Sequence, residues 1–345
     1  HTDDAGFSYE TVTNDPTGLR LYTLENGLKV YLAKNEEEPK IQTYIAVRAG
    51  SNYDPKENTG LAHYLEHMLF KGTDEIGTQD FEKEKVLLQE ISDLFEKHRA
   101  ETDPAKKKEI YKKIDEVSQE ASKISISNEY DKMTSSLGAQ GTNAHTWVEE
   151  TVYQNKIPAN ELDKWLKLEG ERFSQLVLRL FHTELETVYE EFNRGQDNDF
   201  RKTYKAMLEG LFPNHPYGQQ STIGTSEHLK NPSMVAIHKY FDSYYVPDNM
   251  AVVFVGDLDF DHTIKKVNEA FGGYVKKDVQ HPVFPKESPI TSPVVKEVFG
   301  PTAERITIAF RSPAIGTKEE QLLTMADMLL TNGKAGLIDL NLNQK

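Results

Sequence analysis

The apolar positions along this chain change period several times, and each period predicts a type of secondary structure. Residues 19–24 and 28–32 have strand-like patterns on either side of Asn26-Gly27, a pair that favours a tight hairpin turn. Further strands are expected at 41–47, 148–157 and 250–255, and helices at 60–71, 160–178, 184–194, 198–211, 231–244 and 260–271. This order predicts an α+β fold in which a mixed antiparallel sheet is flanked by helices.

Residues 81–132 interrupt this order with the pattern of two charged amphipathic helices. Asp103-Pro104 favours the start of the second helix, since both residue types are common at helix N-termini. The expected apolar faces are Val86, Leu87, Ile91, Leu94 and Phe95 on the first helix, and Ile110, Ile114 and Val117 on the second. We expect an inserted helical hairpin, for which a solvated surface addition is favoured over a role at the rim of a functional site.

The proline-rich region 279–293 follows the last of these helices and is typical of a linker. Beyond it, strands are expected at 294–299 and 306–310, and a helix at 319–330. We therefore expect one complete domain at 1–278, which includes the hairpin at about 81–132, and an incomplete start of a second, related α/β domain at 294–345. The chain is then expected to be part of a longer protein.

The most informative chemical motif is His63-Tyr64-Leu65-Glu66-His67, which reads H-x-x-E-H. Residues four apart lie one turn above each other on a helix, so the imidazoles of His63 and His67 can bind one metal ion. The Glu66 carboxylate lies at the edge of the same face, where it can contact a water molecule without binding the metal itself. Two histidines and an adjacent carboxylate are the side chains of a metal-dependent hydrolase.

The residues around this motif favour a buried helix. Asn58 or Thr59 is the expected N-cap, and Gly72 is the expected residue after the C-terminus. The apolar surface is formed by Leu61, Tyr64, Leu65, Met68 and Leu69. Two satisfied core histidines are the alternative interpretation. A metal ion is favoured because two buried histidines and a glutamate need compensation for lost hydration.

A catalytic zinc site takes three protein ligands and leaves one position open. The best region for the third ligand is the expected helix at 184–194, whose buried stripe is formed by Leu185, Val188 and Phe192. An advance of about 100° per residue places Glu184 and Glu191 together along one flank of this stripe. Glu186 and Glu190 point towards solvent. An ordinary acidic surface helix is the alternative, which the histidine pair makes less favourable.

Several motifs in register resemble the pitrilysin/insulinase family of inverzincin peptidases, which includes mitochondrial processing peptidase. The resemblance covers nearly the whole chain. It rests on His63-x-x-Glu66-His67 followed by Met68-Leu69-Phe70-Lys71-Gly72-Thr73, on Gly141-Thr142-Asn143-Ala144-His145-Thr146, on the segment from Glu184 to Glu191, on Asn214-His215-Pro216-Tyr217-Gly218, on Ile223-Gly224-Thr225, on Tyr244-Tyr245-Val246-Pro247-Asp248-Asn249-Met250, and on Val253-Phe254-Val255-Gly256-Asp257.

This resemblance implies one Zn²⁺ per chain, bound by His63, His67 and Glu191, with Glu184 as an outer carboxylate that orients the site. It implies a zinc-dependent endopeptidase in which Glu66 accepts a proton from the attacking water and passes it to the departing amine. A peptide or unfolded polypeptide substrate is expected to bind as an added strand beside Asn143 and Ala144. The alternative is a non-catalytic partner or scaffold half of a two-part peptidase.

Two features depart from the family pattern. The segment between His67 and Glu191 is longer than expected, and the hairpin at 81–132 accounts for the surplus. His145 stands where the family often has an aromatic residue, so a fourth metal ligand is an alternative, although not the favoured one. The resemblance also implies a second half, as a C-terminal region or a partner chain, that helps to hold the substrate.

Composition narrows the class of protein further. The net charge of −15 with no basic cluster argues against nucleic acid as a partner, and no run of apolar residues is long enough for a membrane span. The chain has no cysteine, which removes disulfides and thiol chemistry. By analogy with bacterial relatives we expect a periplasmic or otherwise extracytoplasmic location, in preference to a mitochondrial or cytoplasmic one. A homo-oligomer is compatible with the sequence.

Overall fold

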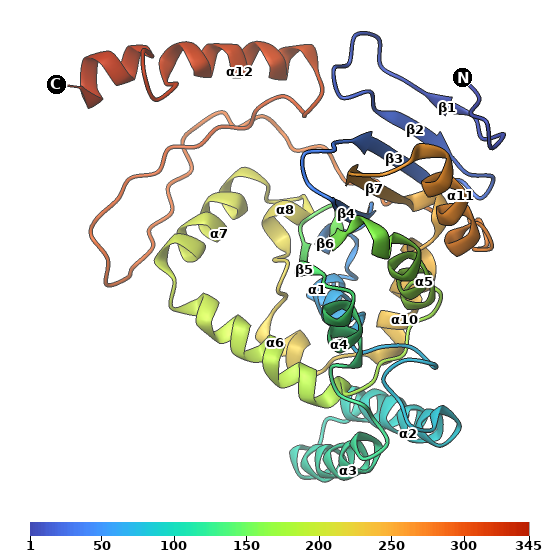
Figure 1. The fold of residues 1–345 in the computed structure, drawn as a ribbon. Helices are drawn as coiled ribbons and strands as arrows, with labels where there is room; N and C mark the ends of the chain where they lie inside the picture. The colour runs from blue at the N-terminus through green and yellow to red at the C-terminus, as the bar shows by residue number, and fades with distance from the viewer. Residues whose placement is uncertain (345) are drawn as a thin grey trace.

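A mixed β-sheet forms the centre of the computed structural model, which describes residues 1–344 (Figure 1). Within these residues the sheet has seven strands in the order β1-β2-β3-β7-β4-β6-β5. Strands β3 and β7 are parallel, and the other neighbouring pairs are antiparallel. The strands are β1 Tyr9–Glu10, β2 Arg20–Thr23, β3 Lys29–Lys34, β4 Lys40–Val47, β5 Gln140–Thr146, β6 Thr151–Pro158 and β7 Met250–Gly256. The predicted α+β fold with a mixed sheet is therefore confirmed.

Helices cover one face of this sheet. Every second residue of β4, β6 and β7 is buried, and the residues between them are partly exposed or exposed. The buried face shares one continuous core with the surrounding helices. The helices are α1 Leu61–Met68, α2 Phe81–Ala100, α3 Pro104–Ser122, α4 Glu129–Ser136, α5 Leu162–Arg172, α6 Phe181–Gln196, α7 Asp199–Leu211, α8 Pro216–Gln219, α9 Ser226–Lys230, α10 Met234–Tyr244, α11 Phe260–Phe271 and α12 Lys318–Leu330.

The predicted hairpin between β2 and β3 is confirmed at Asn26-Gly27. Gly27 has a left-handed φ of 92°, which the tight turn requires and glycine adopts without strain. The Asn26 side chain donates to the carbonyl of Phe271 at 2.8 Å and so ties the turn to the end of α11. The turn residues thus set the strand register and also anchor a helix.

The inserted helices α2 and α3 form the expected hairpin, but its interpretation as a solvated addition is wrong. Ile91, Phe95 and Ile114 are buried in the main core, and α3 packs against α6 while α2 packs against α10. The prediction also misplaced Val86, which is 63% exposed. The buried residues of α2 are Glu84, Ile91, Phe95 and His98. The buried face of the helix therefore includes Glu84, and Val86 lies on the exposed face.

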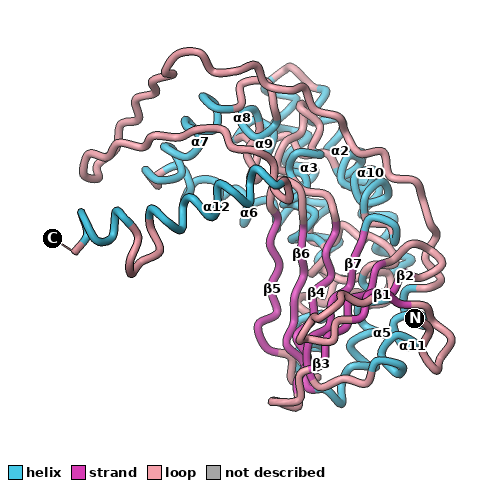
Figure 2. The backbone as a smooth tube through the Cα atoms, turned by 90° about the horizontal axis from the view of Figure 1, so that it is seen from above, coloured by secondary structure: helices cyan, strands magenta, loops and turns pink. Residues whose placement is uncertain are grey.

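The region after α11 differs most from the prediction. The expected strands at 294–299 and 306–310 are wrong, because no described residue of either segment pairs with a strand. Their apolar side chains Val295, Phe299, Ile306 and Phe310 are 80–90% exposed. The helix expected at 319–330 is confirmed as α12, which extends away from the sheet (Figure 2). Residues 279–293 contain no helix or strand, as a linker would, and the division into domains stays a prediction.

Among residues 1–344, no helix combines the length and the apolar character that crossing a membrane requires.

Candidate metal centre

Helix α1 carries the H-x-x-E-H motif, and a carboxylate from the preceding loop caps it. The helix begins at Leu61 after Gly60, whose φ is 87°, so the predicted N-cap at Asn58 or Thr59 is wrong. Asp54 replaces it, because its side chain accepts hydrogen bonds from the backbone N–H groups of Gly60 and Ala62 at 2.8 and 2.9 Å. Burial raises the pKa of Asp54 to about 8, although the backbone hydrogen bonds oppose the rise.

Helix α6 brings the second set of acidic side chains to α1. It starts at Phe181, directly after Leu180, which has a left-handed φ of 55°. The Tyr64 hydroxyl of α1 donates to the Phe181 carbonyl at 2.5 Å, and the two rings stack with centroids 4.6 Å apart. This contact fixes the start of α6 next to the middle of α1. As predicted, Glu186 and Glu190 are exposed on the other side of α6.

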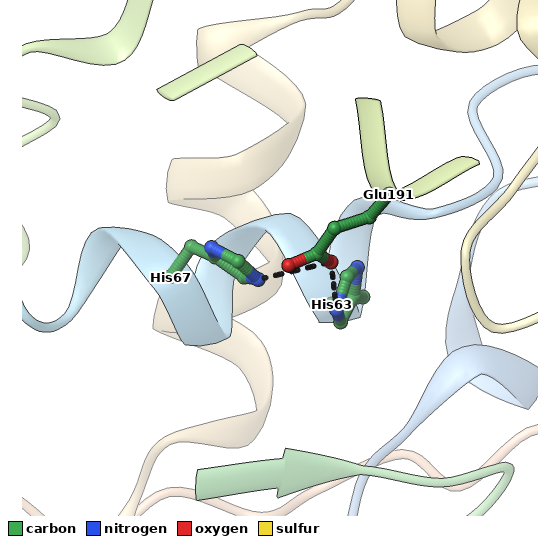
Figure 3. Close-up of side chains that lie close together, drawn as sticks. All are labelled: His63, His67 and Glu191. Carbon is green, nitrogen blue, oxygen red and sulfur yellow. Dashed lines mark ion pairs between the residues drawn. The ribbon is translucent and has the colours of Figure 1, made fainter. Parts of the chain in front are cut away.

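The side chains of His63, His67 and Glu191 converge on one point (Figure 3). Oε2 of Glu191 lies 3.7 Å from Nε2 of His63 and 3.8 Å from Nε2 of His67. One ligand atom from each residue lies within 4.8 Å of the others. These separations are too long for hydrogen bonds, but they suit three atoms that share one cation through bonds of about 2.0–2.2 Å.

The acidic groups around His67 favour a positive charge at this point. Nδ1 of His67 lies 2.8 Å from Oε1 of Glu184, which can only accept a hydrogen bond when ionised. Burial by itself would lower the pKa of His67, but the hydrogen bond and charge of Glu184, together with the charges of Glu191 and Glu66, outweigh it, and the net pKa is raised. With a hydrogen on Nδ1, the nitrogen that can bind a metal is Nε2, which faces the Glu191 carboxylate. The two nitrogens and one oxygen fit zinc, which commonly takes this donor set.

Glu184 is buried, at 8% exposure, and is held by two cationic or hydrogen-bonding partners. Besides His67, it pairs with Lys71, whose Nζ lies 2.5 Å from Oε2. Burial by itself would raise the pKa of Glu184, but the hydrogen bonds from His67 and Lys71 outweigh it, and the net pKa is lowered. Glu184 is therefore an ionised carboxylate that orients a histidine.

Glu66 is on α1, and its side chain contacts the edge strand β5. Its side chain is 7% exposed, and Oε2 accepts a hydrogen bond of 2.6 Å from the Thr146 hydroxyl. Burial raises the pKa of Glu66 above its ordinary value, although the bond from Thr146 opposes the rise. A carboxylate with a raised pKa is better suited to accept a proton near neutral pH.

Burial also acts on His63. It lowers the pKa of His63 to about 4, and the neighbouring charge of His67 lowers it further. His63 is therefore neutral at physiological pH, as a metal ligand must be. Its Nδ1 is buried without a hydrogen-bond partner among the described residues.

The predicted substrate residues Asn143 and Ala144 lie on β5 at the edge of the sheet. Asn143 is exposed, and Ala144 is half-buried on the face that also carries Thr146. Their role in binding a peptide stays a prediction. His145 is exposed and lies 3.6 Å from Glu150, outside the group of possible ligands in the described part of the chain.

Sequence reasoning missed three residues that support the site. Lys71 follows His67 by four positions, so the same helical spacing that joins the two histidines could have indicated it. Thr146 lies two positions after Ala144 on β5, hence on the same face, and could have been placed towards α1. No local signal in the sequence indicates Asp54 as the cap of α1.

Two protein-family models match parts of this chain. The family model described as insulinase (peptidase family M16) matches residues 29–89, which contain the H-x-x-E-H motif. The model described as the peptidase M16 inactive domain matches residues 235–345. The chain therefore belongs to peptidase family M16, the pitrilysin/insulinase family.

Relatives named as zinc proteases support this assignment. The zinc protease PqqE of Helicobacter pylori is 25% identical over 94% of this chain and 63% of its own length. The uncharacterized zinc protease YmxG of Bacillus subtilis is 23% identical over 75% of this chain and 51% of its own length. Human insulin-degrading enzyme is 25% identical over 84% of this chain and 24% of its own length. The chain thus spans about half of YmxG and less than two thirds of PqqE.

Solved structures share the fold. The first half of the periplasmic protease PqqL from Escherichia coli aligns with a TM-score of 0.61 and 18% identity, covering 81% of this chain and 51% of that chain. A protease from Helicobacter pylori aligns with a TM-score of 0.59 and 22% identity, covering 81% and 55%.

Proposed function

We propose that this chain is the zinc-binding part of an endopeptidase that hydrolyses peptides or unfolded polypeptide segments. One observation carries the proposal: three side chains from two helices, His63 and His67 of α1 and Glu191 of α6, converge within 4.8 Å next to the buried carboxylate of Glu66. Membership of a family whose relatives are named zinc proteases supports it.

Each residue of the site has a separate role. His63, His67 and Glu191 would hold one Zn²⁺ per chain. When bound, zinc polarises a carbonyl group and acidifies water. Glu66 would accept the proton of the attacking water and then donate it to the departing amine. Thr146 holds the Glu66 carboxylate in place through its hydroxyl.

The edge strand β5 is the proposed binding surface for the substrate backbone. It has β6 on one side, and its other edge faces away from the sheet. An extended peptide added beside Asn143 and Ala144 would form backbone hydrogen bonds that tolerate varied sequences. Its scissile bond would lie next to Thr146 and therefore close to Glu66.

A second half of the peptidase is part of the proposal. The chain spans 51% of YmxG and 63% of PqqE, so these relatives have further sequence that would contribute to the substrate chamber. The second half would be a C-terminal region or a partner chain. We also propose an extracytoplasmic location, which the similarity to the periplasmic protease PqqL supports.

Two measurements test the proposed function. The zinc content of the purified protein should approach one equivalent, and quenched fluorogenic peptides should be cleaved in a chelator-sensitive manner. The assay should be done with the chain alone and with the rest of the protein supplied. Zinc without cleavage in both cases would support a non-catalytic half instead, and absence of zinc binding would refute the proposed site.

A further inference from the structure

Arg179 is a buried cation whose five N–H groups all have acceptors. Its side chain is fully buried, and Nε and Nη2 each donate to one oxygen of Glu84 at 2.7 Å. The other N–H groups donate to backbone carbonyls: Nη1 to Lys71 at 3.0 Å and to Ile76 at 2.9 Å, and Nη2 to Thr73 at 2.8 Å. A guanidinium has no further donors, so this residue is completely satisfied.

Arg179 and its partners belong to three different parts of the chain. The carbonyls lie in the loop 71–77, which directly follows the H-x-x-E-H helix. Arg179 itself precedes Leu180, the N-cap residue of α6. Glu84 belongs to the inserted hairpin. One side chain therefore connects the end of the histidine helix with the start of the glutamate helix, and the insertion neutralises its charge.

The loop is folded closely around the guanidinium. Gly72 and Gly77 both have left-handed φ values, of 98° and 92°. A Cβ on Gly77 would lie 2.7 Å from Nη1 of Arg179, and one on Gly72 would lie 3.0 Å from it. Both positions thus need glycine for conformation and for space.

Lys71 links the Arg179–Glu84 pair to the metal ligands. Its carbonyl accepts from Arg179, while its ammonium pairs with Glu184, which in turn contacts Nδ1 of His67. We infer that Arg179 and Glu84 form a positioning pair that fixes Lys71 against Glu184 and thereby orients His67 towards the metal. The inference rests on the proposed zinc site, since it concerns the affinity of that site.

Arg179 and Glu84 hold the loop 71–77 through the geometry of their hydrogen bonds as well as through their charges. Removing Glu84 would leave the buried guanidinium without its counter-charge, which is strongly unfavourable. Replacing Arg179 by lysine would keep the charge but lose the planar fork that binds a carboxylate and three carbonyls at once. In both cases the loop 71–77 would lose its fixed position, and Glu184 would lose its cationic partner.

The chain offers a matched control for this test. Arg172 is also a buried arginine paired with a buried glutamate, Glu169, and the pair lies within α5. Its other neighbours are the rings of Phe70, Tyr130, Tyr153 and Phe173. The experiment is zinc affinity, measured by competition with a chromophoric chelator, together with thermal unfolding of the metal-free protein. Arg179→Lys should weaken zinc binding by roughly 10–100-fold, whereas Arg172→Lys should lower stability and leave zinc affinity near that of wild type.

A second variant keeps the inference testable if Arg179→Lys does not fold. Lys71 is partly exposed, so Lys71→Met should still fold and should bind zinc more weakly, while Lys71→Arg should restore most of the affinity. Normal zinc affinity in Lys71→Met would overturn the inference. Failure of the wild-type protein to bind zinc would instead refute the proposed function, so the two failures are distinguishable.

Discussion

Nδ1 of His67 on α1 lies 2.8 Å from Oε1 of Glu184 on α6, although the two residues are 117 positions apart in the sequence. The contact determines which nitrogen of His67 carries its hydrogen and therefore which nitrogen is free to bind a metal. Glu184 is in turn held by Lys71 at 2.5 Å. The orientation of His67 thus depends on Glu184, which is not one of the three converging ligands.

Replacing Glu184 by glutamine should weaken zinc binding without removing a ligand. The amide can still contact His67, but it carries no charge and pairs poorly with Lys71. We expect a loss of affinity of about 10-fold or more, measured by chelator competition. Glu186→Gln on the exposed side of the same helix is the control and should bind zinc as wild type does.

Replacing Glu191 by glutamine should have a larger effect on the metal. Its carboxylate is the only acidic group among the three converging side chains in the described part of the chain. Loss of a charged ligand should reduce the zinc content of the purified protein to well below one equivalent, measured by atomic emission. The adjacent Glu190→Gln changes an exposed residue and should retain full zinc content. Equal zinc content in both variants would exclude Glu191 as a ligand.

Glu66→Gln should separate metal binding from chemistry. The amide can still accept the hydrogen bond from Thr146, so the fold around it should be kept. It cannot accept a proton, and peptide cleavage should therefore fall by about 10²–10⁴-fold. The check is a parallel measurement of zinc content and cleavage rate. A variant that cuts peptides at a near-normal rate would remove Glu66 from its proposed role.

The inserted hairpin should contribute to the stability of the whole domain. Ile91 is buried in the main core, so Ile91→Ala should lower the free energy of unfolding by about 2–5 kcal/mol in denaturant titrations. Val86 lies on the same helix but is largely exposed, and Val86→Ala should change stability by no more than about 0.5 kcal/mol. Similar small effects for both would show that the hairpin is independent of the core.

His98 should make the free energy of unfolding depend on pH. Burial lowers its pKa below the ordinary value of 6.5, and the charge of Lys107 lowers it further. As the pH falls below 6.5, the unfolded chain takes up a proton that the folded protein does not, so stability decreases. His98→Gln should therefore show a shallower decrease between about pH 7 and 5 in denaturant titrations than the wild type does. An equally steep decrease in the variant and the wild type would exclude His98 as the source of the pH dependence.

Much of the fold and part of the site could be predicted because local patterns carry them. The alternating residues of β4 and β7 and the Asn26-Gly27 turn led to strands and a hairpin that the structure contains. The spacing of His63 and His67 placed both on one face of a helix. The strands expected at 294–299 and 306–310 were wrong, since a strand also requires a hydrogen-bonded partner that no local pattern can supply.

By itself, the sequence determined the periodic elements, the histidine motif and the family, because each depends on residues close together along the chain. Only the tertiary structure decided that Arg179 and Glu84 hold the loop after α1, that Asp54 caps that helix, and that Thr146 holds Glu66. The Arg179 and Thr146 contacts join residues far apart in sequence, and the Asp54 contact depends on how the loop before α1 folds. The energies of all three depend on burial and on short distances between polar atoms. Such quantities arise only when the chain has folded.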